Sequence, residues 1–471
     1  MALSLVMMSW ALVLFGMCYN IIDLFHLDER FLPANLHIWI RKYLLYPALF
    51  REKCSVPIQL TQGFPIDYVP PRLVSVAIFC YNVLNIIFCA VPYTGFWEFQ
   101  WYPHDTASLM YTYVGNRTGI LSFANIPIMF MFASRNNIFQ WLTGWSFATF
   151  QHFHRHISII CILEAFVHSV CYTIKFNKKP NDASYYAAEA AKGYFWWGII
   201  ATTACFIIPV FAVLKIRLTS YELFLVVHYI LAILFLLGCA YHIILRYHNK
   251  WGYCYWLYCS YAVWGFDWFI RILRCCYLKF IKGYGCKATV ELIDLDSRTL
   301  KITYQTTKNN DCQNCVGNYY YLYFFTLFPF FTSHPFTVSE WKHKYSDISP
   351  KHQKDVAVAT NMAISNSSNK GESDDTDGMN KEDDHTTMRN TESASPVPQQ
   401  STISSESQLV FYVQCMNGTT NKIFQQLSKN DFKPIQIRSL LEGPYGSFET
   451  TSVFEDYDFL LILTGGIDYS F

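Results

Sequence analysis

The sequence has few charged residues. Only 15% of its 471 residues are Asp, Glu, Lys or Arg, whereas soluble domains usually contain about 25%. In contrast, 52% of the residues are hydrophobic and 18% are aromatic. Because the hydrophobic residues occur in long blocks, an ordinary soluble protein is excluded and a protein that crosses a membrane several times is expected.

The chain also lacks an excess of basic residues and a disulfide pattern. Its 36 Lys and Arg nearly balance 35 Asp and Glu, so it has no basic surface that would favour nucleic acid as a partner. The 16 cysteines are scattered, many within hydrophobic stretches, and we interpret most as small core residues. Cys312 and Cys315 form a single CxxC without a second pair, which favours a turn over a zinc site.

Seven hydrophobic stretches approach the ~20 residues that a membrane-spanning helix needs. They are Leu3–Ile22, Leu73–Pro92, Thr118–Ser134, Ile157–Ile174, Gly193–Leu214, Leu223–Ile244 and Trp251–Phe266. The first could instead be a signal peptide, but no basic residue precedes it and no clear cleavage site follows. We therefore expect about seven spans.

The basic residues between the stretches predict the orientation. Segment 23–72 and the segment after the last stretch are rich in Lys and Arg, so both are expected in the cytosol. Loop 93–117 has one basic residue and is expected outside, where Asn116 begins a glycosylation sequon. Four lysines in loop 175–192, which is also predicted to be external, oppose this orientation.

The composition changes near Gly285, where short strand-like segments replace the long hydrophobic stretches. We expect an antiparallel β-barrel over 285–446, interrupted by a disordered insertion at 346–407 that contains no aromatic residue. The complete expected order is an N-terminal span and cytosolic loop (1–72), a transmembrane domain (73–274), the barrel, and a short remnant of another domain (459–471).

Four histidines share one spacing. His154 and His168 are fourteen residues apart, and so are His228 and His242. Fourteen residues rise about 21 Å on an α-helix and complete nearly four turns, so each pair lies on one helix face near opposite edges of the bilayer. Two such helices side by side can bind two stacked haems (haem b), each between two axial histidines. Packed polar histidines are the alternative.

If both helices enter from the cytosol, His154 and His228 bind the inner haem and His168 and His242 the outer one. His152 and His156 lie close to His154, but they do not reproduce the interval. Three nearby residues have open roles. Phe235 can separate the haems or be an ordinary core residue, Arg155 can pair with a haem propionate or mark the membrane edge, and Glu164 can orient His168, carry a proton or simply be buried.

Two tetrapeptides follow in the second half: His334-Pro335-Phe336-Thr337, and Gly443-Pro444-Tyr445-Gly446 after Glu442. With the four histidines and Ser220-Tyr221-Glu222, they resemble fungal ferric reductases, relatives of the NADPH oxidases, over essentially the whole chain. The resemblance implies that the first tetrapeptide lines an FAD and that the second lies near the flavin and nicotinamide sites. Glycines at 443 and 446 are compatible with a tight turn close to a ligand. Taken alone, either tetrapeptide could instead be the end of a strand or a hairpin turn.

The family continues into an NADPH-binding domain that begins with a strand and a glycine-rich turn. Residues 459–466 resemble this beginning, with Gly465 and Gly466 as candidate nucleotide-binding residues. Ile467 and Asp468 replace the next expected glycine, and a doubly wound domain needs several more strands and helices. We therefore expect an NADPH site that is incomplete in this chain, or one that a partner chain completes.

The resemblance implies a multi-pass plasma-membrane reductase. Electrons from NADPH would pass through FAD and two haems to ferric or cupric chelates outside the cell. A superoxide-producing oxidase would use the same groups with O₂ as acceptor. A truncated, non-catalytic haem protein of the membrane is the alternative from a different class, and a mis-assigned reading frame is a third explanation.

Overall fold

The computed structural model describes residues 57–91, 105–177, 183–306, 318–325, 333–343, 407–416 and 418–445, with a few isolated positions before residue 50 and Tyr93. Several sequence predictions fall outside these residues. They concern the first hydrophobic stretch, Cys312 and Cys315, almost all of the insertion 346–407, Gly446, and the segment 459–471 with Gly465 and Gly466.

Long helices form the first half of the molecule. They are α4 (Arg72–Ala90), α5 (Thr106–Ala133), α7 (Phe147–Asn177), α9 (Gly193–Phe211), α11 (Tyr221–Tyr247) and α12 (Cys254–Cys276). They coincide with six of the seven predicted stretches. Among the described helices, α4, α7, α9 and α11 are long and apolar enough to cross a membrane. The number of seven spans stays a prediction.

Helix α5 begins twelve residues before the predicted stretch. The Asp105 side chain accepts a hydrogen bond from the Ser108 amide at 3.0 Å and caps the first turn. Asn116 therefore lies inside the helix, where its side chain accepts a hydrogen bond from Tyr172 at 2.5 Å. Residues 106–117 of the predicted loop are therefore helical. The external location and the use of the sequon stay predictions.

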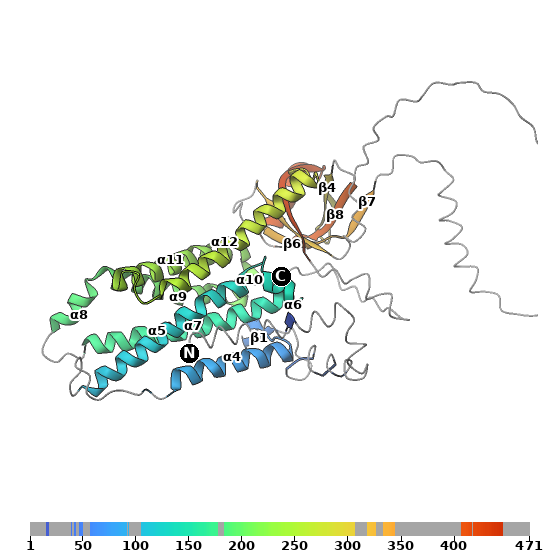
Figure 1. Ribbon diagram of the computed structural model, residues 1–471. Coiled ribbons are helices and arrows are strands. Elements are labelled where there is room, and N and C mark those ends of the chain that lie inside the picture. Colours follow the sequence, from blue (N-terminus) through green and yellow to red (C-terminus); the bar gives the residue numbers. More distant parts are fainter. Residues whose placement is uncertain are drawn as a thin grey trace, which may run out of the picture.

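The helices pack as two close pairs, α5 with α7 and α9 with α11 (Figure 1). Small residues allow this contact. A Cβ atom on Gly238 of α11 would lie 2.8 Å from the Cβ of Ala201 on α9, and the Ser122 hydroxyl of α5 donates to the Cys161 carbonyl of α7 at 3.0 Å. Close approach through small residues is typical of helices packed within membranes, where hydrophobicity alone does not distinguish helix from lipid.

Shorter elements connect the long helices. They are the hairpin β1 (Pro57–Thr61) and β2 (Phe64–Tyr68), helices α6 (Ile138–Thr143), α8 (Ala183–Ala190) and α10 (Leu214–Thr219), and the π-helical turn Tyr277–Ile281 after α12. Helix α6 begins where the Asn137 side chain accepts from the Phe139 amide at 2.9 Å and ends at Gly144, which has φ 65°. This short turn separates α5 from α7.

The second half is a seven-stranded antiparallel sheet with the order β6-β5-β9-β3-β4-β8-β7. Its strands are β3 (Lys287–Asp294), β4 (Thr299–Thr306), β5 (Tyr319–Phe324), β6 (Ser333–Thr337), β7 (Glu340–His343), β8 (Ser407–Gln414) and β9 (Ile435–Tyr445). Strands β6 and β7 stand at opposite ends of this order, yet only two residues connect them, so the sheet curls back on itself. Closure into a complete barrel stays a prediction.

Two elements of this half were not predicted. Helix α14 (Thr419–Lys429) buries Ile423 and Leu427 against the sheet core. Strand β9 includes Gly443, Pro444 and Tyr445, which the sequence placed in a tight turn. The sheet lies at one end of the helix bundle, and α12 leads from the bundle into it (Figure 1).

Candidate functional site: two histidine pairs and a flavin-type sheet

The four equally spaced histidines meet in two pairs. The ring centres of His154 and His228 are 6.3 Å apart with their planes at 74°. The ring centres of His168 and His242 are 6.2 Å apart with their planes at 87°. We call these the sheet-side pair and the far-side pair, because α11 starts against the sheet and its residue Glu222 contacts α14. These are the two pairs that the spacing predicted.

The separations suit a haem iron between two imidazoles. Two metal–nitrogen bonds of about 2.0 Å each, with about 1.1 Å more from each nitrogen to its ring centre, add to about 6.2 Å. No group of three or more His, Cys, Asp or Glu residues that could hold a metal ion occurs within the described residues. A metal that already has four equatorial ligands, as haem iron does, is therefore the better match for two isolated pairs.

Backbone carbonyls orient both far-side rings. Nδ1 of His168 lies 2.7 Å from the Gly115 carbonyl oxygen on α5, and Nδ1 of His242 lies 2.8 Å from the Tyr194 carbonyl oxygen on α9. A carbonyl only accepts, so each Nδ1 must donate its hydrogen. Nε2 then keeps the lone pair that a metal requires.

Glycine makes room for each of these rings. Gly119 lies four residues after Gly115, and a Cβ on Gly119 would approach Nδ1 of His168 to 2.6 Å. Gly198 likewise lies four residues after Tyr194, and its Cβ would approach Nδ1 of His242 to 2.8 Å. Sequence reasoning missed both glycines, because the ring and the glycine belong to different helices.

The sheet-side pair is supported differently. Nδ1 of His154 lies 3.0 Å from the Met129 carbonyl oxygen, and Ala133, four residues further, replaces the glycine of the far side. Nδ1 of His228 is buried but makes no hydrogen bond within the described part of the chain. Only one of these two imidazoles is thus fixed by the backbone.

The histidines next to His154 have other partners. Arg155 donates from Nε to Asp67 of β2 at 2.8 Å, and its Nη2 lies 2.8 Å from Nδ1 of His152. Arg217 of α10 also reaches Asp67, at 3.3 Å. Asp67 therefore connects the β1–β2 hairpin to two helices, and Arg155 has an ion-pair partner that the sequence did not indicate.

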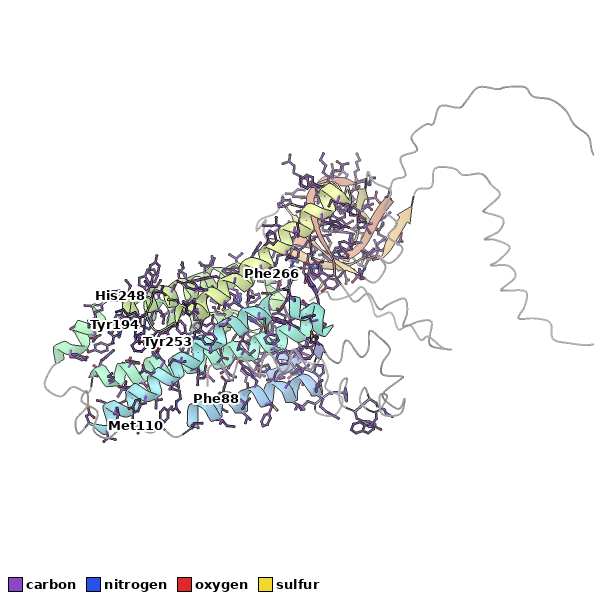
Figure 2. The ribbon with its side chains drawn as sticks, in the orientation of Figure 1. Phe88, Met110, Tyr194, His248, Tyr253 and Phe266 are labelled. Atoms are coloured by element: carbon purple, nitrogen blue, oxygen red, sulfur yellow. The ribbon has the colours of Figure 1, made fainter. Side chains whose placement is uncertain are left out.

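A cavity of about 310 Å³ adjoins the far-side pair. His168, His242, Gly119 and Gly198 line it, as does the buried side chain of Phe235. It extends past Tyr194 to Tyr253, which Figure 2 labels at the end of the bundle away from the sheet. The open prediction that Phe235 lies between two haems is compatible with this position.

Glu164 does not orient His168. Its carboxylate accepts from Asn125 at 2.8 Å and lies 3.9 Å from the Cys89 thiol, whereas the Gly115 carbonyl takes the His168 hydrogen. That interpretation was wrong, because the side chain points between α4 and α5. The alternatives of a proton carrier or a buried carboxyl group stay open.

The two sequence tetrapeptides lie on opposite sides of strand β5. Tyr319 of β5 pairs with Thr337 of β6 on one side and with Tyr445 of β9 on the other. Gly443 packs directly against the ring of Tyr320, because a Cβ at position 443 would lie 2.6 Å from Cδ1 of Tyr320. Its small size therefore accommodates Tyr320, which corrects the expected tight turn.

His334 lies at the junction with the helix bundle. Its Nε2 is 3.8 Å from the Glu222 carboxylate of α11, and this buried nitrogen has no hydrogen-bond partner within the described residues. Burial lowers the pKa of His334, the charge of Arg135 lowers it further, and Glu222 opposes both. A buried polar atom without a partner at the first position of the expected flavin motif is compatible with a ligand that is bound there.

Glu442 forms a buried ion pair with the helix bundle. Nη1 of Arg135, just after α5, lies 3.1 Å from the fully buried Glu442 carboxylate, and the hydroxyls of Tyr323 and Tyr445 donate to that carboxylate. Burial raises the pKa of Glu442, but Arg135, Arg271 and the two hydroxyls together bring it below its ordinary value. This cluster of residues fixes the sheet to the bundle.

Arg135 also contacts the sheet in two further ways. Its Nη2 donates to the Ser333 hydroxyl at 3.1 Å, and its guanidinium lies 3.3 Å from the ring centre of Tyr321. Pro444 accepts from Arg274 of α12 at 2.6 Å. In this structure, Pro444 and Tyr445 therefore contact the helix bundle, while His334, Pro335, Phe336 and Thr337 form strand β6 on the other side of β5.

The helical half and the sheet half of the chain each match a known protein family. The family of ferric reductase like transmembrane components matches residues 118–239, which include His154, His168 and His228 and end three residues before His242. The FAD-binding domain family matches residues 285–389, which include His334 to Thr337.

Individual relatives cover both halves. The chain is 27% identical over 439 residues to ferric/cupric reductase transmembrane component 1 of Candida albicans, which covers 93% of this chain and 47% of that protein. It is 24% identical over 445 residues to ferric/cupric reductase transmembrane component 2 of Saccharomyces cerevisiae, covering 92% and 49%. The chain thus spans about half the length of the curated relatives it matches. The matches to both domain families and the similarity to these relatives support a fungal ferric reductase.

Proposed function

We propose that this chain carries electrons across a membrane, from a flavin at the sheet through two haems to a ferric or cupric chelate. The two histidine pairs are the observation that carries the proposal. Both pairs come from the same two helices, and both have ring separations suited to one iron atom. When bound, the haems and the flavin supply the electron chemistry, and the protein supplies position and environment.

The residues have distinct roles in this proposal. The sheet-side pair His154 and His228 holds the inner haem, and the far-side pair His168 and His242 holds the outer haem. His334, Pro335, Phe336 and Thr337 of β6 line the flavin. Gly443, Pro444 and Tyr445 of β9, with Gly446 directly after, lie on the other side of β5. Arg135 and Glu442 hold the sheet against the bundle, which limits how far an electron must travel to the first haem.

The proposed electron acceptor is supported by the names of the relatives, and the proposed electron donor by the family resemblance. Their names contain ferric and cupric reductase, so we propose ferric or cupric chelates as acceptors. NADPH is the proposed donor, with Gly465 and Gly466 as part of its site and a partner chain as one way to complete that site. The resemblance to fungal ferric reductases supports a plasma-membrane location, and the basic segments near the sheet support a cytosolic sheet.

Haem content provides the direct test. The purified chain should contain two low-spin haems, measured by extraction and by its absorption spectrum. His154→Ala or His228→Ala should remove the inner haem, and His168→Ala or His242→Ala the outer one. His152→Ala and His156→Ala are matched controls on the same helix, and each should keep both haems. Two haems in a quadruple alanine variant of the paired histidines would disprove the assignment.

Electron transfer is tested separately from haem binding. In vesicles with the sheet outside, dithionite should reduce the haems, and an enclosed ferric chelate should then reoxidise them. Bound FAD should be released and identified after denaturation. Haems that stay reduced in the presence of enclosed ferric and cupric chelates, but are oxidised by O₂ at once, would favour an oxidase instead.

A further inference from the structure

A chain of buried polar side chains connects α4, α5 and α7. Asn125 of α5 donates to Glu164 of α7 at 2.8 Å and to Asn85 of α4 at 3.1 Å. The hydroxyl of Tyr81 donates to the Asn125 carbonyl oxygen. Exposed fractions are 5% for Glu164 and 0% for Asn125. Polar groups inside a membrane domain are costly, and they commonly have a function.

Glu164 has hydrogen-bond donors but no cation. Asn125 donates to one carboxylate oxygen, and the Cys89 thiol of α4 lies 3.9 Å from the other. On its own helix, Cys161 is the nearby titratable group. Arg117 is directed elsewhere, to the Val91 carbonyl at 2.5 Å. Within the described residues, Glu164 forms no ion pair with Lys, Arg or His.

These contacts act in opposite directions on the protonation state of Glu164. Two donors directed at the carboxylate oxygens favour the ionised form, whereas burial without a cation favours the neutral acid. A further negative charge nearby then makes the neutral form more stable. Such a group responds to charge added in its neighbourhood, even when no atom moves.

The far-side pair is where such a charge would arrive. Glu164 precedes His168 by four residues, which is about 6 Å along the helix axis. Helix α5 supports both residues, with Gly115 accepting from His168 and Asn125 donating to Glu164. The polar chain is not needed to orient His168, so its burial requires another explanation.

We propose that Glu164 takes up one proton when the far-side haem is reduced and releases it on reoxidation. The inference rests on the proposed function, because that function supplies the electron. The balance is one electron to the ferric iron and one proton to the carboxylate, which yield ferrous iron and a neutral carboxylic acid. In this proposal the proton comes from bulk water at the C-terminal end of α4, where Cys89 lies in the last turn. Figure 2 labels the neighbouring residue, Phe88. Oxidation of the iron by the acceptor reverses both steps.

Infrared spectroscopy tests this in the unmodified protein. The reduced-minus-oxidised spectrum should contain the C=O band of a protonated carboxylic acid, shifted in D₂O and by carbon-13 labelling of glutamate. Glu164→Gln should abolish the band. The matched control is Glu189→Gln, which should retain it, because Glu189 has a cationic partner in Lys192 and stays ionised.

Redox titration gives a second readout. The reduction equilibrium of the far-side haem should change with pH, by up to about tenfold per pH unit over the range in which Glu164 takes up its proton. This dependence should be lost in Glu164→Gln and kept in Glu164→Asp and Glu189→Gln. An equal pH dependence in the wild type and Glu164→Gln would overturn the inference.

The outcomes separate this inference from the proposed function. A protein without two haems disproves the proposed function. A protein with two haems whose spectrum contains no redox-dependent carboxyl band disproves the role of Glu164 alone. Because the infrared test uses wild-type protein, absence of the band overturns the inference even if Glu164→Gln fails to fold, and Glu164→Asp then serves to assign a band that is present.

Discussion

The two histidine pairs have nearly the same geometry but different supports. Their ring separations are 6.3 and 6.2 Å. On the far side, both rings donate to helix carbonyls and lie against a glycine. On the sheet side, one ring donates to a carbonyl and His228 has no such partner among the described residues. The same ligand spacing can therefore be achieved with different degrees of backbone support.

The charged residues around the pairs differ as well. The sheet-side end of the bundle holds the Asp67 ion pairs with Arg155 and Arg217 and the buried pair of Arg135 and Glu442. At the far side, Glu164 is buried one helical turn before His168 and forms no ion pair with a cation in the described part of the chain. The sheet side is thus organised by contacts with other elements, whereas the far side is organised within the helix pairs themselves.

The largest expected effect is at the far-side glycines. We expect Gly119→Val or Gly198→Val to remove the outer haem and leave the inner one, because even a Cβ would lie 2.6 or 2.8 Å from Nδ1 of the opposing histidine. The imidazole would have to leave its carbonyl and its ligand position. Haem per chain should fall by about half, as measured by extraction.

The matched control is Gly265→Val on α12, where a Cβ would meet nothing within 4 Å. This variant should retain both haems, since its side chain enters open space. Two haems in both Gly119→Val and Gly198→Val would show that the close contact does not decide ligation. Loss of both haems in either variant would show that the two sites do not form independently.

The second-largest expected effect is at the ion pair between Arg135 and Glu442, which joins the sheet to the helix bundle. Arg135→Ala leaves the Glu442 carboxylate buried without its cation, which typically destabilises a structure by about 3–5 kcal/mol. We expect looser contact between sheet and bundle, and slower flavin-to-haem transfer in stopped-flow measurements. Direct reduction of the haems by dithionite should be unchanged.

The control for this variant removes both charges. Arg135→Met with Glu442→Gln should recover part of the stability, because a neutral pair of similar size leaves no buried charge. Arg135→Ala would contradict the assigned role if haem reduction through the flavin stayed as fast as in the wild type.

A pH dependence should distinguish the sheet junction from the far side. The pKa of His334 is lowered on folding, so its stabilising contribution is complete above the unfolded value of about 6.5 and is lost as the pH falls. The pKa of Glu442 is also lowered, and its contribution is lost below about 4.3, the usual value for Glu. Stability should therefore decline in two steps on acidification.

Urea unfolding followed through flavin release should measure both steps. Each group limits the slope to about 1.4 kcal/mol per pH unit. His334→Gln should remove the upper step and Glu442→Gln the lower one. A wild-type protein that becomes more stable between about pH 7 and about pH 5 would contradict the prediction for His334.

Sequence reasoning found the residues that repeat along one helix. The fourteen-residue interval placed the four histidines in the right pairs, because helix geometry converts spacing directly into position. The hydrophobic stretches predicted α4, α7, α9 and α11, because a helix that crosses a membrane needs a long run of apolar residues. The change to short strand-like segments near Gly285 predicted that strands form the second half.

Relations between elements were not predictable in this way. Gly119 and Gly198 matter because of rings on neighbouring helices, and Arg135 matters because of Glu442, more than 300 residues further along the chain. The first part of α5 was missed because packing against α7, not hydrophobicity, stabilises those polar turns. Gly443 was assigned to a turn because the pairing of β9 with β5 cannot be read from either segment alone.

The smallest expected effect is a difference in redox potential between the two haems. A hydrogen bond from Nδ1 to a carbonyl makes an imidazole a better electron donor, which stabilises ferric iron. The far-side pair has two such bonds and the sheet-side pair has one. The sheet-side haem should therefore have the higher midpoint potential, by less than the 59 mV that corresponds to about a tenfold change.

Single-haem proteins allow this comparison. His168→Ala with His242→Ala keeps the sheet-side haem, and His154→Ala with His228→Ala keeps the far-side haem. Both should also carry Glu164→Gln, because a carboxylate near the far side would lower that potential on its own. Arg155→Gln in the sheet-side protein measures how much the Asp67 ion pairs contribute. If the far-side haem then has the higher potential, the missing hydrogen bond at His228 does not govern the difference between the two sites.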